Sequence, residues 1–571
     1  MATICRSIAA LCILFASLSA APRRSFAQTS SPDIILYNGK IFTSSTTRPY
    51  VQALAIRGER IVAIGDSAKI LALRGPATRA LDLRGRTVIP GINDAHVHLD
   101  IEPANEVQLV VEGQNPTREQ MLAAITAAVK KAAPGSLLTA EIGPAVYFDP
   151  QTTLAALDSI APNNPVMLVM LTGHAAFLNT AALKQFGIRE DQPNPLGGKY
   201  ERGPDGKLTG VVREYALMNL ERQLADATSD AVALQQVQSQ LNEAARFGIT
   251  TIQDMSNMMT PDRAVALLQK LPPTARVRIM RMPGTNTTGR NVQEGRRAPH
   301  PTSPLITVNG TKWMLDGTPL EGSFASRESR AADFASASGQ AKSGKTTESI
   351  FANFDMLFPQ PELTAMLRET LQDNDPLLLH VSGYIAASTM LQTLQSNGGS
   401  AVWSARRVRF EHGDGLYPDL IPSAKQLGIV VVQNPTHFVA SSLIPGLVLE
   451  KSQPFRSLLD AGIPLALGSD GPMNPYLNIM LAAVDPGRPS QAITREQAVI
   501  AYTLTSAYAE FAEKEKGSLE PGKLADLAVL SQDIFTVSPP DLPKTASVLT
   551  LVGGKVIYDA KVISAPPAGS N

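Results

Sequence analysis

The amino-acid sequence predicts an α/β fold: a (β/α)8 TIM-like barrel with an inserted subdomain, plus a small β-sandwich formed from the N- and C-terminal segments. Three observations favour it. Strand-like and helical runs alternate through the middle of the chain, short glycine-punctuated strands occur at both ends, and most histidines follow strand-like runs. We expect a signal peptide over residues 1–27, sandwich strands over 28–87, the barrel over 88–515 and further sandwich strands over 516–571.

The first 27 residues have the pattern of a cleaved signal peptide. Arg6 supplies a positive charge, and Ser7–Ala21 form an apolar stretch that is too short to span a bilayer. Ala27 completes a small-residue cleavage pattern, so we expect the mature chain to begin after it and to be exported to the periplasm or secreted. A membrane anchor is the alternative. Both cysteines, Cys5 and Cys12, lie in this segment, so the mature protein would need no disulfide.

The segments expected to form the sandwich have the same pattern at both ends of the chain. Strand-like runs follow the signal peptide at Ile34–Phe42, Ala53–Ile56 and Arg60–Gly65, and similar runs occur at Ala525–Leu530 and Val548–Tyr558. Glycines separate them at the spacing of strands and turns. Because a few short strands cannot bury enough surface alone, we expect the two sets to pair with each other.

The barrel segment contains more strand-like runs than a barrel of eight strands can use. Helical runs such as Arg118–Lys131 and Ala231–Phe247 separate some of them. With the run that begins at Val88, the total exceeds eight, so several strands between residues 100 and 285 are assigned to an inserted subdomain. After Val88 the predicted strands are Leu137–Glu141, Val166–Leu171, Thr250–Asp254, Arg276–Arg281, Thr311–Leu315, Pro376–His380, Val408–His412, Ile429–Gln433 and Pro464–Gly468.

Several of these strands end in side chains that bind metals. His96 and His98 are two residues apart on a strand and therefore point to the same side. His380 and His412 each close a strand-like run, and Asp470 follows the last one. In a barrel the carboxyl ends of the strands meet at one face, where active sites lie. Imidazole and carboxylate are ligands of divalent metals, so the pattern predicts a metal site.

With these residues in view, the sequence resembles the amidohydrolase superfamily, in particular amidohydrolase family 3, the branch that includes the N-substituted formamide deformylases. The matching segments extend in order from about residue 32 to residue 560. They are Pro90–His98, Gly173-His174, Gly248–Thr251, His380, Glu411-His412, Gln433–His437 and Gly468–Pro472. The resemblance implies a hydrolase that acts on a non-peptide carbon–nitrogen bond of an amide, formamide or cyclic amide, with a small-molecule amide as substrate.

The resemblance also implies roles for individual residues. His96, His98 and Asp470 would hold one metal, His380 and His412 a second, and Lys312, carboxylated by carbon dioxide, would join the two. The expected cofactors are two divalent ions, with zinc as the expected element, and the nucleophile would be a hydroxide between them. Asp470 would be the catalytic residue, because it can accept a proton during attack and return it to the leaving nitrogen.

His174 and His437 are the remaining candidates. Each matches a family position near the barrel mouth, where an imidazole could bind the substrate carbonyl or orient a ligand. We expect His300 to be a loop residue. For Glu214 two interpretations are open, a side chain that faces the pocket and a solvated glutamate, and the second is favoured.

Other functions remain open or are disfavoured. A mononuclear metal-dependent deaminase of the same fold would need no bridging lysine, and a non-catalytic scaffold would have lost ligands. The chain has 51 basic and 51 acidic residues. This balance argues against a nucleic acid or an anionic membrane surface as a partner. A homodimer is left open.

The stretches 283–304 and 317–347 lack periodicity and are interpreted as loops over the barrel mouth.

Overall fold

The computed structural model describes residues 31–103, 106–113, 115–272, 274–297, 299–301, 303–342, 354–437, 451–485 and 488–563. The expected signal peptide lies outside this part of the chain. Within the described ranges, no helix combines the length and the apolar character needed to cross a bilayer.

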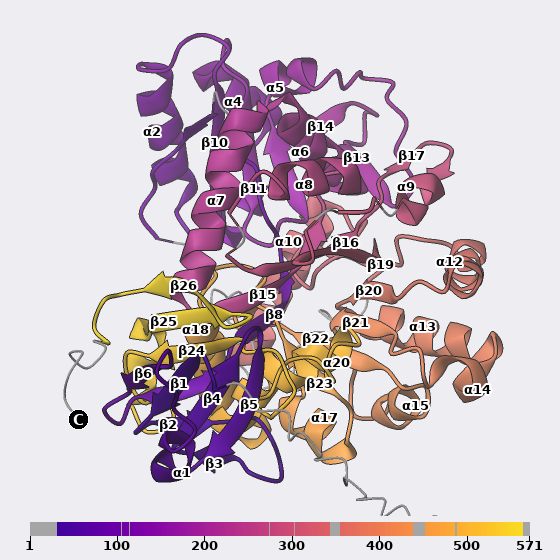
Figure 1. Ribbon diagram of the computed structural model, residues 1–571. Helices are drawn as coiled ribbons and strands as arrows, with labels where there is room; N and C mark the ends of the chain where they lie inside the picture. Colours follow the sequence, from indigo (N-terminus) through magenta and orange to yellow (C-terminus); the bar gives the residue numbers. More distant parts are fainter. Residues whose placement is uncertain are drawn as a thin grey trace, which may run out of the picture.

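Strands from both ends of the chain form two sheets at one corner of the molecule, coloured indigo and yellow in Figure 1. The strands are β1 (Ile34–Tyr37), β2 (Lys40–Phe42), β3 (Tyr50–Val51), β4 (Ala53–Arg57), β5 (Arg60–Gly65), β6 (Arg79–Asp82), β7 (Thr87–Pro90), β24 (Leu527–Leu530), β25 (Ser547–Val552) and β26 (Lys555–Asp559). One sheet has the order β5-β4-β1-β6 and the other the order β26-β25-β24-β7-β2-β3. Leu54 and Leu551 share one buried cluster between them. The predicted sandwich of the two chain ends is confirmed.

The two ends of the chain join where β24 pairs antiparallel with β7, with Ala528 opposite Ile89. The chain then passes through Gly91 directly from the sandwich sheet into the barrel. The segment around Val88 is therefore two strands rather than one, and the first of them crosses the domain boundary expected at residue 87.

An eight-stranded parallel sheet forms the barrel. Its strands are β8 (Ile92–Val97), β15 (Ile249–Ser256), β16 (Arg276–Arg281), β19 (Ile306–Met314), β20 (Leu377–Val381), β21 (Arg409–His412), β22 (Val430–Gln433) and β23 (Leu465–Leu467). They are hydrogen-bonded in this order. The first and last strands meet after β23, where the Asp470 amide donates to the His96 carbonyl over 3.0 Å. A Cβ atom on Gly468 would lie 2.6 Å from the His96 nitrogen, so this close approach requires glycine.

A subdomain is inserted between β8 and β15, above the barrel in Figure 1. It contains a six-stranded sheet with the order β13-β14-β12-β11-β10-β9. Two of the strands predicted from sequence, at 137–141 and 166–171, belong to it as β10 and β11, and their removal leaves eight for the barrel. Its elements are β9 (Glu106–Gln108), α2 (Arg118–Val129), β10 (Leu137–Ile142), α3 (Pro144–Tyr147), α4 (Leu154–Ile160), β11 (Val166–Met170), β12 (Ala175–Leu178), α5 (Thr180–Gln185), β13 (Gly198–Arg202), β14 (Leu208–Glu214) and α6 (Tyr215–Ala227).

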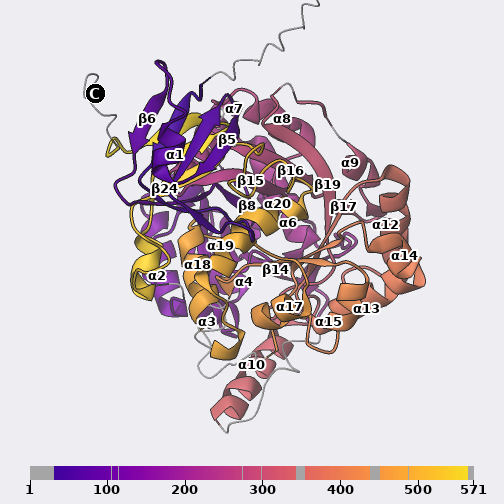
Figure 2. The same ribbon diagram turned by 60° about the horizontal axis from the view of Figure 1, so that its bottom comes forward.

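The long helix α7 (Asp230–Arg246) returns the chain to the barrel. The remaining barrel helices lie outside the strands, as Figure 2 shows for those after β20. They include α8 (Pro261–Leu268), α12 (Gln360–Asp373), α13 (Tyr384–Ser396), α15 (Ile421–Gln426), α17 (Phe455–Ala461), α18 (Pro475–Val484) and α19 (Arg495–Ile500).

The two stretches interpreted as loops are partly ordered. The first holds the two-stranded hairpin of β17 (Thr285–Asn286) and β18 (Gly289–Arg290) and the short helix α9 (Val292–Arg296). The second holds α10 (Arg327–Lys342), which projects from the molecule in Figure 2. The sequence of α10 contains a single large apolar residue, so it gives no apolar pattern from which the helix could be predicted.

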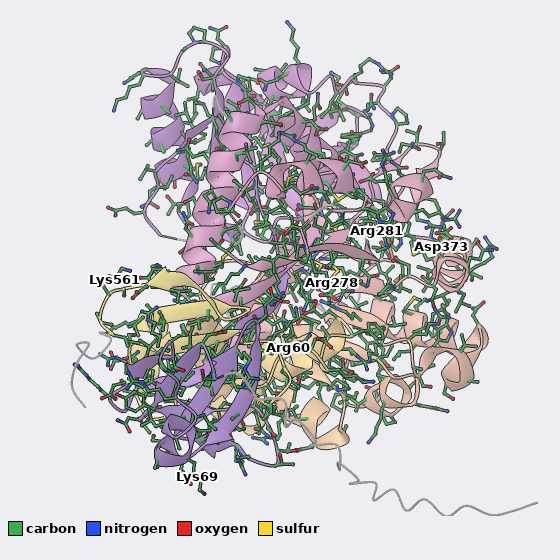
Figure 3. All side chains as sticks on the ribbon, in the orientation of Figure 1. Arg60, Lys69, Arg278, Arg281, Asp373 and Lys561 are labelled. Carbon is green, nitrogen blue, oxygen red and sulfur yellow. The ribbon has the colours of Figure 1, made fainter. Side chains whose placement is uncertain are left out.

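Charged side chains are also buried inside the barrel. Arg278 lies near the centre of the molecule in Figure 3 and is 3% exposed, whereas Lys69 and Lys561 point outward. Arg409 is buried as well, and its Nε donates to Glu411 over 2.7 Å. Glu411 also contacts His96, a predicted metal ligand, so these buried charges lie next to the expected metal centre.

Candidate metal centre and catalytic cavity

Seven of the eight predicted site residues lie at the carboxyl ends of barrel strands. His96 is in β8 and His98 follows it, Lys312 is in β19, His380 in β20 and His412 in β21, while His437 and Asp470 follow β22 and β23. The eighth, His174, comes from the inserted subdomain at the start of β12. The structure therefore brings all eight to the same end of the barrel, as the barrel prediction requires.

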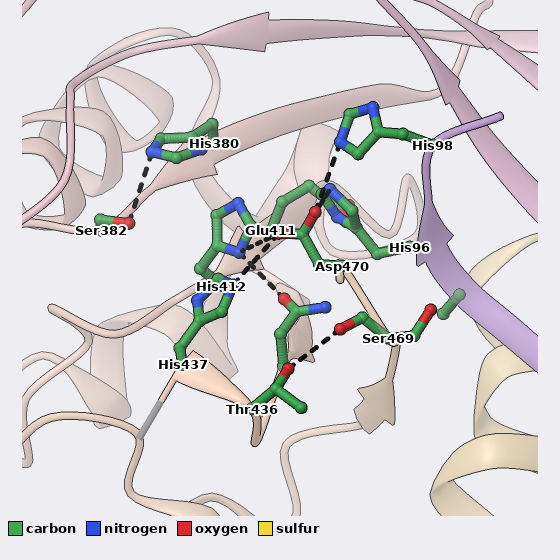
Figure 4. Close-up of polar contacts among 12 residues, drawn as sticks. His96, His98, His380, Ser382, Glu411, His412, Thr436, His437, Ser469 and Asp470 are labelled. Carbon is green, nitrogen blue, oxygen red and sulfur yellow. Dashed lines mark hydrogen bonds and ion pairs between the residues drawn. The ribbon is translucent and has the colours of Figure 1, made fainter. Parts of the chain in front are cut away.

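Asp470 lies at the centre of a group of imidazoles, as Figure 4 shows. Its Oδ1 atom is 3.4 Å from His98 Nε2 and 3.7 Å from His96 Nε2. Its Oδ2 atom is 3.2 Å from His437 Nε2 and 3.5 Å from His412 Nδ1. Burial alone would raise the pKa of this carboxyl group, but the surrounding histidines hold it well below its ordinary value. Asp470 is therefore an ionised carboxylate.

Each of the four predicted histidine ligands has one ring nitrogen engaged by an acceptor of the protein. His96 Nδ1 donates to Glu411 over 2.6 Å, and His98 Nδ1 donates to Asn257 Oδ1 over 3.0 Å. His380 Nε2 donates to the Gly317 carbonyl over 3.2 Å, and His412 Nδ1 donates to Asn434 Oδ1 over 2.9 Å. Such partners set the tautomer and leave the other ring nitrogen as a ligand atom.

The donor set fits a divalent metal. His96, His412 and Asp470 each offer a ligand atom, and these atoms all lie within 4.8 Å of one another. His98 and His380 add two more imidazoles, with ring centroids 5.5 Å from His96 and 4.4 Å from His412 respectively. Nitrogen and carboxylate donors without a thiolate suit ions such as zinc.

Lys312 is buried within this set of donors. Its Nζ atom donates to His96 Nε2 over 3.0 Å, and the whole residue is 2% exposed. Burial lowers the pKa of Lys312 to about 8. The neutral amine, which is the form that can react with an electrophile, is therefore more populated than in an exposed lysine.

Some residues of the site have strained backbone conformations. Three non-glycine residues there, His412, Asp470 and Glu214, have positive φ angles of 67°, 39° and 52°. Such conformations cost on the order of 1–3 kcal/mol each and persist where the surrounding structure enforces them, commonly at functional sites.

A cavity of about 300 Å³ opens over these side chains. His174 reaches it from the inserted subdomain, and its ring centroid is 4.8 Å from that of His380. His174 Nδ1 donates to Glu214 Oε2 over 2.7 Å. Burial opposes protonation of His174, but the Glu214 carboxylate outweighs it and raises the pKa of His174 to about 9.

The interpretation of Glu214 as a solvated glutamate was wrong. Glu214 is 2% exposed, and it caps the start of α6, where the inserted sheet turns toward the cavity. Its carboxylate packs against Gly317, where a Cβ atom would lie 2.5 Å from Oε1. Its partner His174 is 40 residues away, so no local pattern could have revealed the contact. Asn257 and Asn434, which hold two ligand histidines, were missed for the same reason.

His437 and His300 differ in their surroundings. His437 stacks on His412 with ring centroids 5.1 Å apart and contacts Asp470, but it is not among the described residues that line the cavity. His300 is an exposed loop residue, as expected.

A family model of the amidohydrolases matches residues 79–558 of this chain. The chain belongs to the amidohydrolase family. The match covers the barrel, the inserted subdomain and, in the sandwich, strands β6, β7, β24 and β25 and nearly all of β26. The predicted family and fold are confirmed, and with them the assignment of the chain as a metal-dependent hydrolase that acts on carbon–nitrogen bonds.

Curated relatives of this amidohydrolase match it over nearly their whole length. The protein LONG AFTER FAR-RED 3 of Arabidopsis thaliana is 28% identical over 92% of this chain and 91% of its own. The N-substituted formamide deformylase of Arthrobacter pascens is 27% identical over 93% of this chain and 99% of its own.

Solved structures show the same fold. An uncharacterized metal-dependent hydrolase from Pyrococcus horikoshii superposes with a TM-score of 0.61 at 18% identity, covering 89% of this amidohydrolase and 99% of that chain. A zinc-bound adenosine deaminase from Xanthomonas campestris superposes with a TM-score of 0.51 at 15% identity, covering 94% and 95% of the two chains.

Proposed function

We propose that this amidohydrolase cleaves the carbon–nitrogen bond of a small amide, formamide or cyclic amide. The observation that carries the proposal is the convergence of four imidazoles, Lys312 and the Asp470 carboxylate under one cavity. The similarity to an N-substituted formamide deformylase over nearly the full length of both chains supports the choice of bond.

In this proposal two divalent ions, with zinc as the expected element, bind to the donor set. His96, His98 and Asp470 would hold one, and His380 and His412 the other. Lys312 would be carboxylated and shared between the two, which its lowered pKa supports because the neutral amine is the reactive form. When bound, such ions lower the pKa of water and polarise a carbonyl oxygen.

The chain's own residues would move the proton. Asp470 is ionised and can accept a proton on Oδ1 or Oδ2 as water attacks the amide carbon. It would then give that proton to the departing nitrogen, which leaves as a neutral amine. His437, whose Nε2 is 3.2 Å from Asp470 Oδ2, would orient the carboxylate.

His174 would hold the substrate carbonyl. Because Nδ1 donates to Glu214, the Nε2 atom is the ring nitrogen free to face the substrate oxygen, and in the protonated form it carries a donor hydrogen. A preformed donor at an oxygen that gains negative charge in the transition state accelerates acyl transfer. Glu214 is then a positioning residue, which acts through His174.

The test is turnover of a panel of N-formyl and N-acyl amines and cyclic amides by the purified mature chain, with ammonia release from amino-heterocycles measured in parallel. Hydrolysis of at least one amide is expected. Ammonia release without amide cleavage would favour the deaminase, and inactivity on every compound with full metal content would favour the scaffold.

A further inference from the structure

The cavity residues other than the predicted metal ligands include an apolar and acidic group. Its members are the apolar side chains Leu171, Met218, Met258, Met282 and Met314 and two acidic residues, Asp100 and Glu221. Methionine side chains adapt to apolar groups of varied shape. This group is called the acidic wall below, and its residues are the seven named here.

Helix α6 presents part of the acidic wall to the cavity. Met218 and Glu221 are three residues apart, so they lie on one face of this helix. The next residue, Arg222, fixes the helix: its Nε donates to the Asn257 carbonyl over 2.6 Å, and its guanidinium pairs with Glu294 at 2.6 Å. Arg222 also donates to the Met282 carbonyl. Glu221 is therefore held in place by a rigid support rather than by a mobile loop.

The two acidic groups form no ion pair among the described residues, and the cationic groups that act on Glu221 are the imidazoles of His98 and His174. Asp100 is exposed at the mouth and Glu221 is half-buried. Among the described lining residues there is no arginine, and the single lysine, Lys312, lies against His96 at the ligand end. Burial and then the charge of Asp100 raise the pKa of Glu221 to about 7, a cost that a cation placed beside it would relieve.

We propose that the cavity selects amides whose apolar segment ends in a cationic nitrogen, and that it rejects amides carrying a carboxylate at that end, such as N-acyl amino acids. The apolar segment lies against the methionines, and the ammonium group binds Glu221 with Asp100 at the mouth. A carboxylate in the same place would face two acidic groups, and its charge would further oppose the ionisation of Glu221, with no arginine or lysine of the acidic wall to balance it. A cavity of about 300 Å³ restricts the substrate to a small molecule. The inference rests on the proposed amide hydrolysis.

Three N-acyl benzylamines that differ in the charge of the para substituent test this selectivity on the metal-loaded enzyme. They are the N-acyl derivatives of 4-methylbenzylamine, 4-(aminomethyl)benzylamine and 4-carboxybenzylamine, each with the acyl group that the panel identifies. We expect kcat/KM to be about tenfold or more higher for the ammonium compound than for the methyl compound, because a hydrogen bond to a charged group is involved. The carboxylate compound is expected to be the poorest substrate.

The variant Glu221→Gln should lower kcat/KM for the ammonium compound more than for the methyl compound and so remove most of the preference. Asp100→Asn should reduce the preference less, because solvent screens its charge. The matched control is Glu119→Gln, which removes a glutamate that is 77% exposed on the same inserted subdomain. It should leave the order of kcat/KM among the three compounds unchanged.

Two results would overturn the inference. One is equal kcat/KM for the ammonium and methyl compounds. The other is an equal loss on all three compounds in Glu221→Gln. The side chain of Glu221 is hydrogen-bonded to Asn257, which accepts from His98, so an equal loss would mean that Glu221 acts through these residues rather than on the substrate. Calorimetry with the Asp470→Asn variant measures the binding affinity of the three compounds without turnover, and the affinities should follow the same order as kcat/KM. If the parent chain cleaves no amide, the proposed function fails, and the binding order still decides this inference.

Discussion

Replacing Asp470 by asparagine separates proton transfer from metal binding. The two side chains have nearly the same shape, but an amide cannot accept and return a proton. In the parent the carboxylate contacts four imidazoles at 3.2 to 3.7 Å, and these histidines keep it ionised. The substitution therefore removes one charge and one proton acceptor from the centre of the site and leaves the other predicted ligands in place.

The expected effect follows from the role assigned to this carboxylate. General acid–base catalysis contributes typically about 10² to 10⁴-fold in rate, which corresponds to roughly 2.7 to 5.4 kcal/mol of activation free energy. We therefore expect kcat of Asp470→Asn to fall by at least about a hundredfold. Four histidines and Lys312 remain, so appreciable metal should be retained.

The assay measures kcat on an amide that the parent cleaves, together with metal content by elemental analysis of the same preparations. Asp191→Asn is the matched control, because it removes a carboxylate that is 79% exposed and is not among the residues that line the cavity. Retention of the metals together with near-parental kcat would refute the reasoning, and His437 would then become the candidate for proton transfer.

Other outcomes follow from the same structure. Elemental analysis should find about two divalent ions per chain, and Lys312→Ala should lower this number; a single ion unaffected by that substitution would favour the mononuclear reading. Gly468→Ala should lower the melting temperature, since its Cβ would lie 2.6 Å from the His96 nitrogen and such overpacking costs about 1–3 kcal/mol, whereas Gly65→Ala, with its nearest atoms at 3.9 Å, should change it little. We also propose that the mature chain begins after Ala27 in an exported fraction; mass spectrometry that finds Met1 to Ala21 on a cytosolic protein would contradict this.

Much of the fold could be predicted because its signals are local. The helices expected at 118–131 and 231–247 are α2 (Arg118–Val129) and α7 (Asp230–Arg246), each within two residues at its ends. Their amphipathic spacing depends only on neighbours three and four residues away. The order in which the strands pair is not a local property. Only the structure shows that β10 and β11 pair with each other outside the barrel and so belong to the inserted subdomain.

The sequence by itself determined the kind of chemistry. It placed histidines and an aspartate at strand ends, and the carboxyl ends of parallel strands in a barrel converge whatever the details of packing. The predicted site residues could therefore be selected one strand at a time. Lys312 was a candidate only through the family resemblance, because a lone lysine on a strand has no local signature.

Tertiary structure alone decided how these residues are oriented and what the cavity can accept. His96 and its acceptor Glu411 are 315 residues apart, and His98 and Asn257 are 159 apart. The acidic wall depends on how the inserted subdomain docks, because Glu221 belongs to α6 while Asp100 follows β8 and Met282 follows β16. Contacts of this kind arise from the packing of distant elements, and no periodicity along the chain encodes which elements will meet.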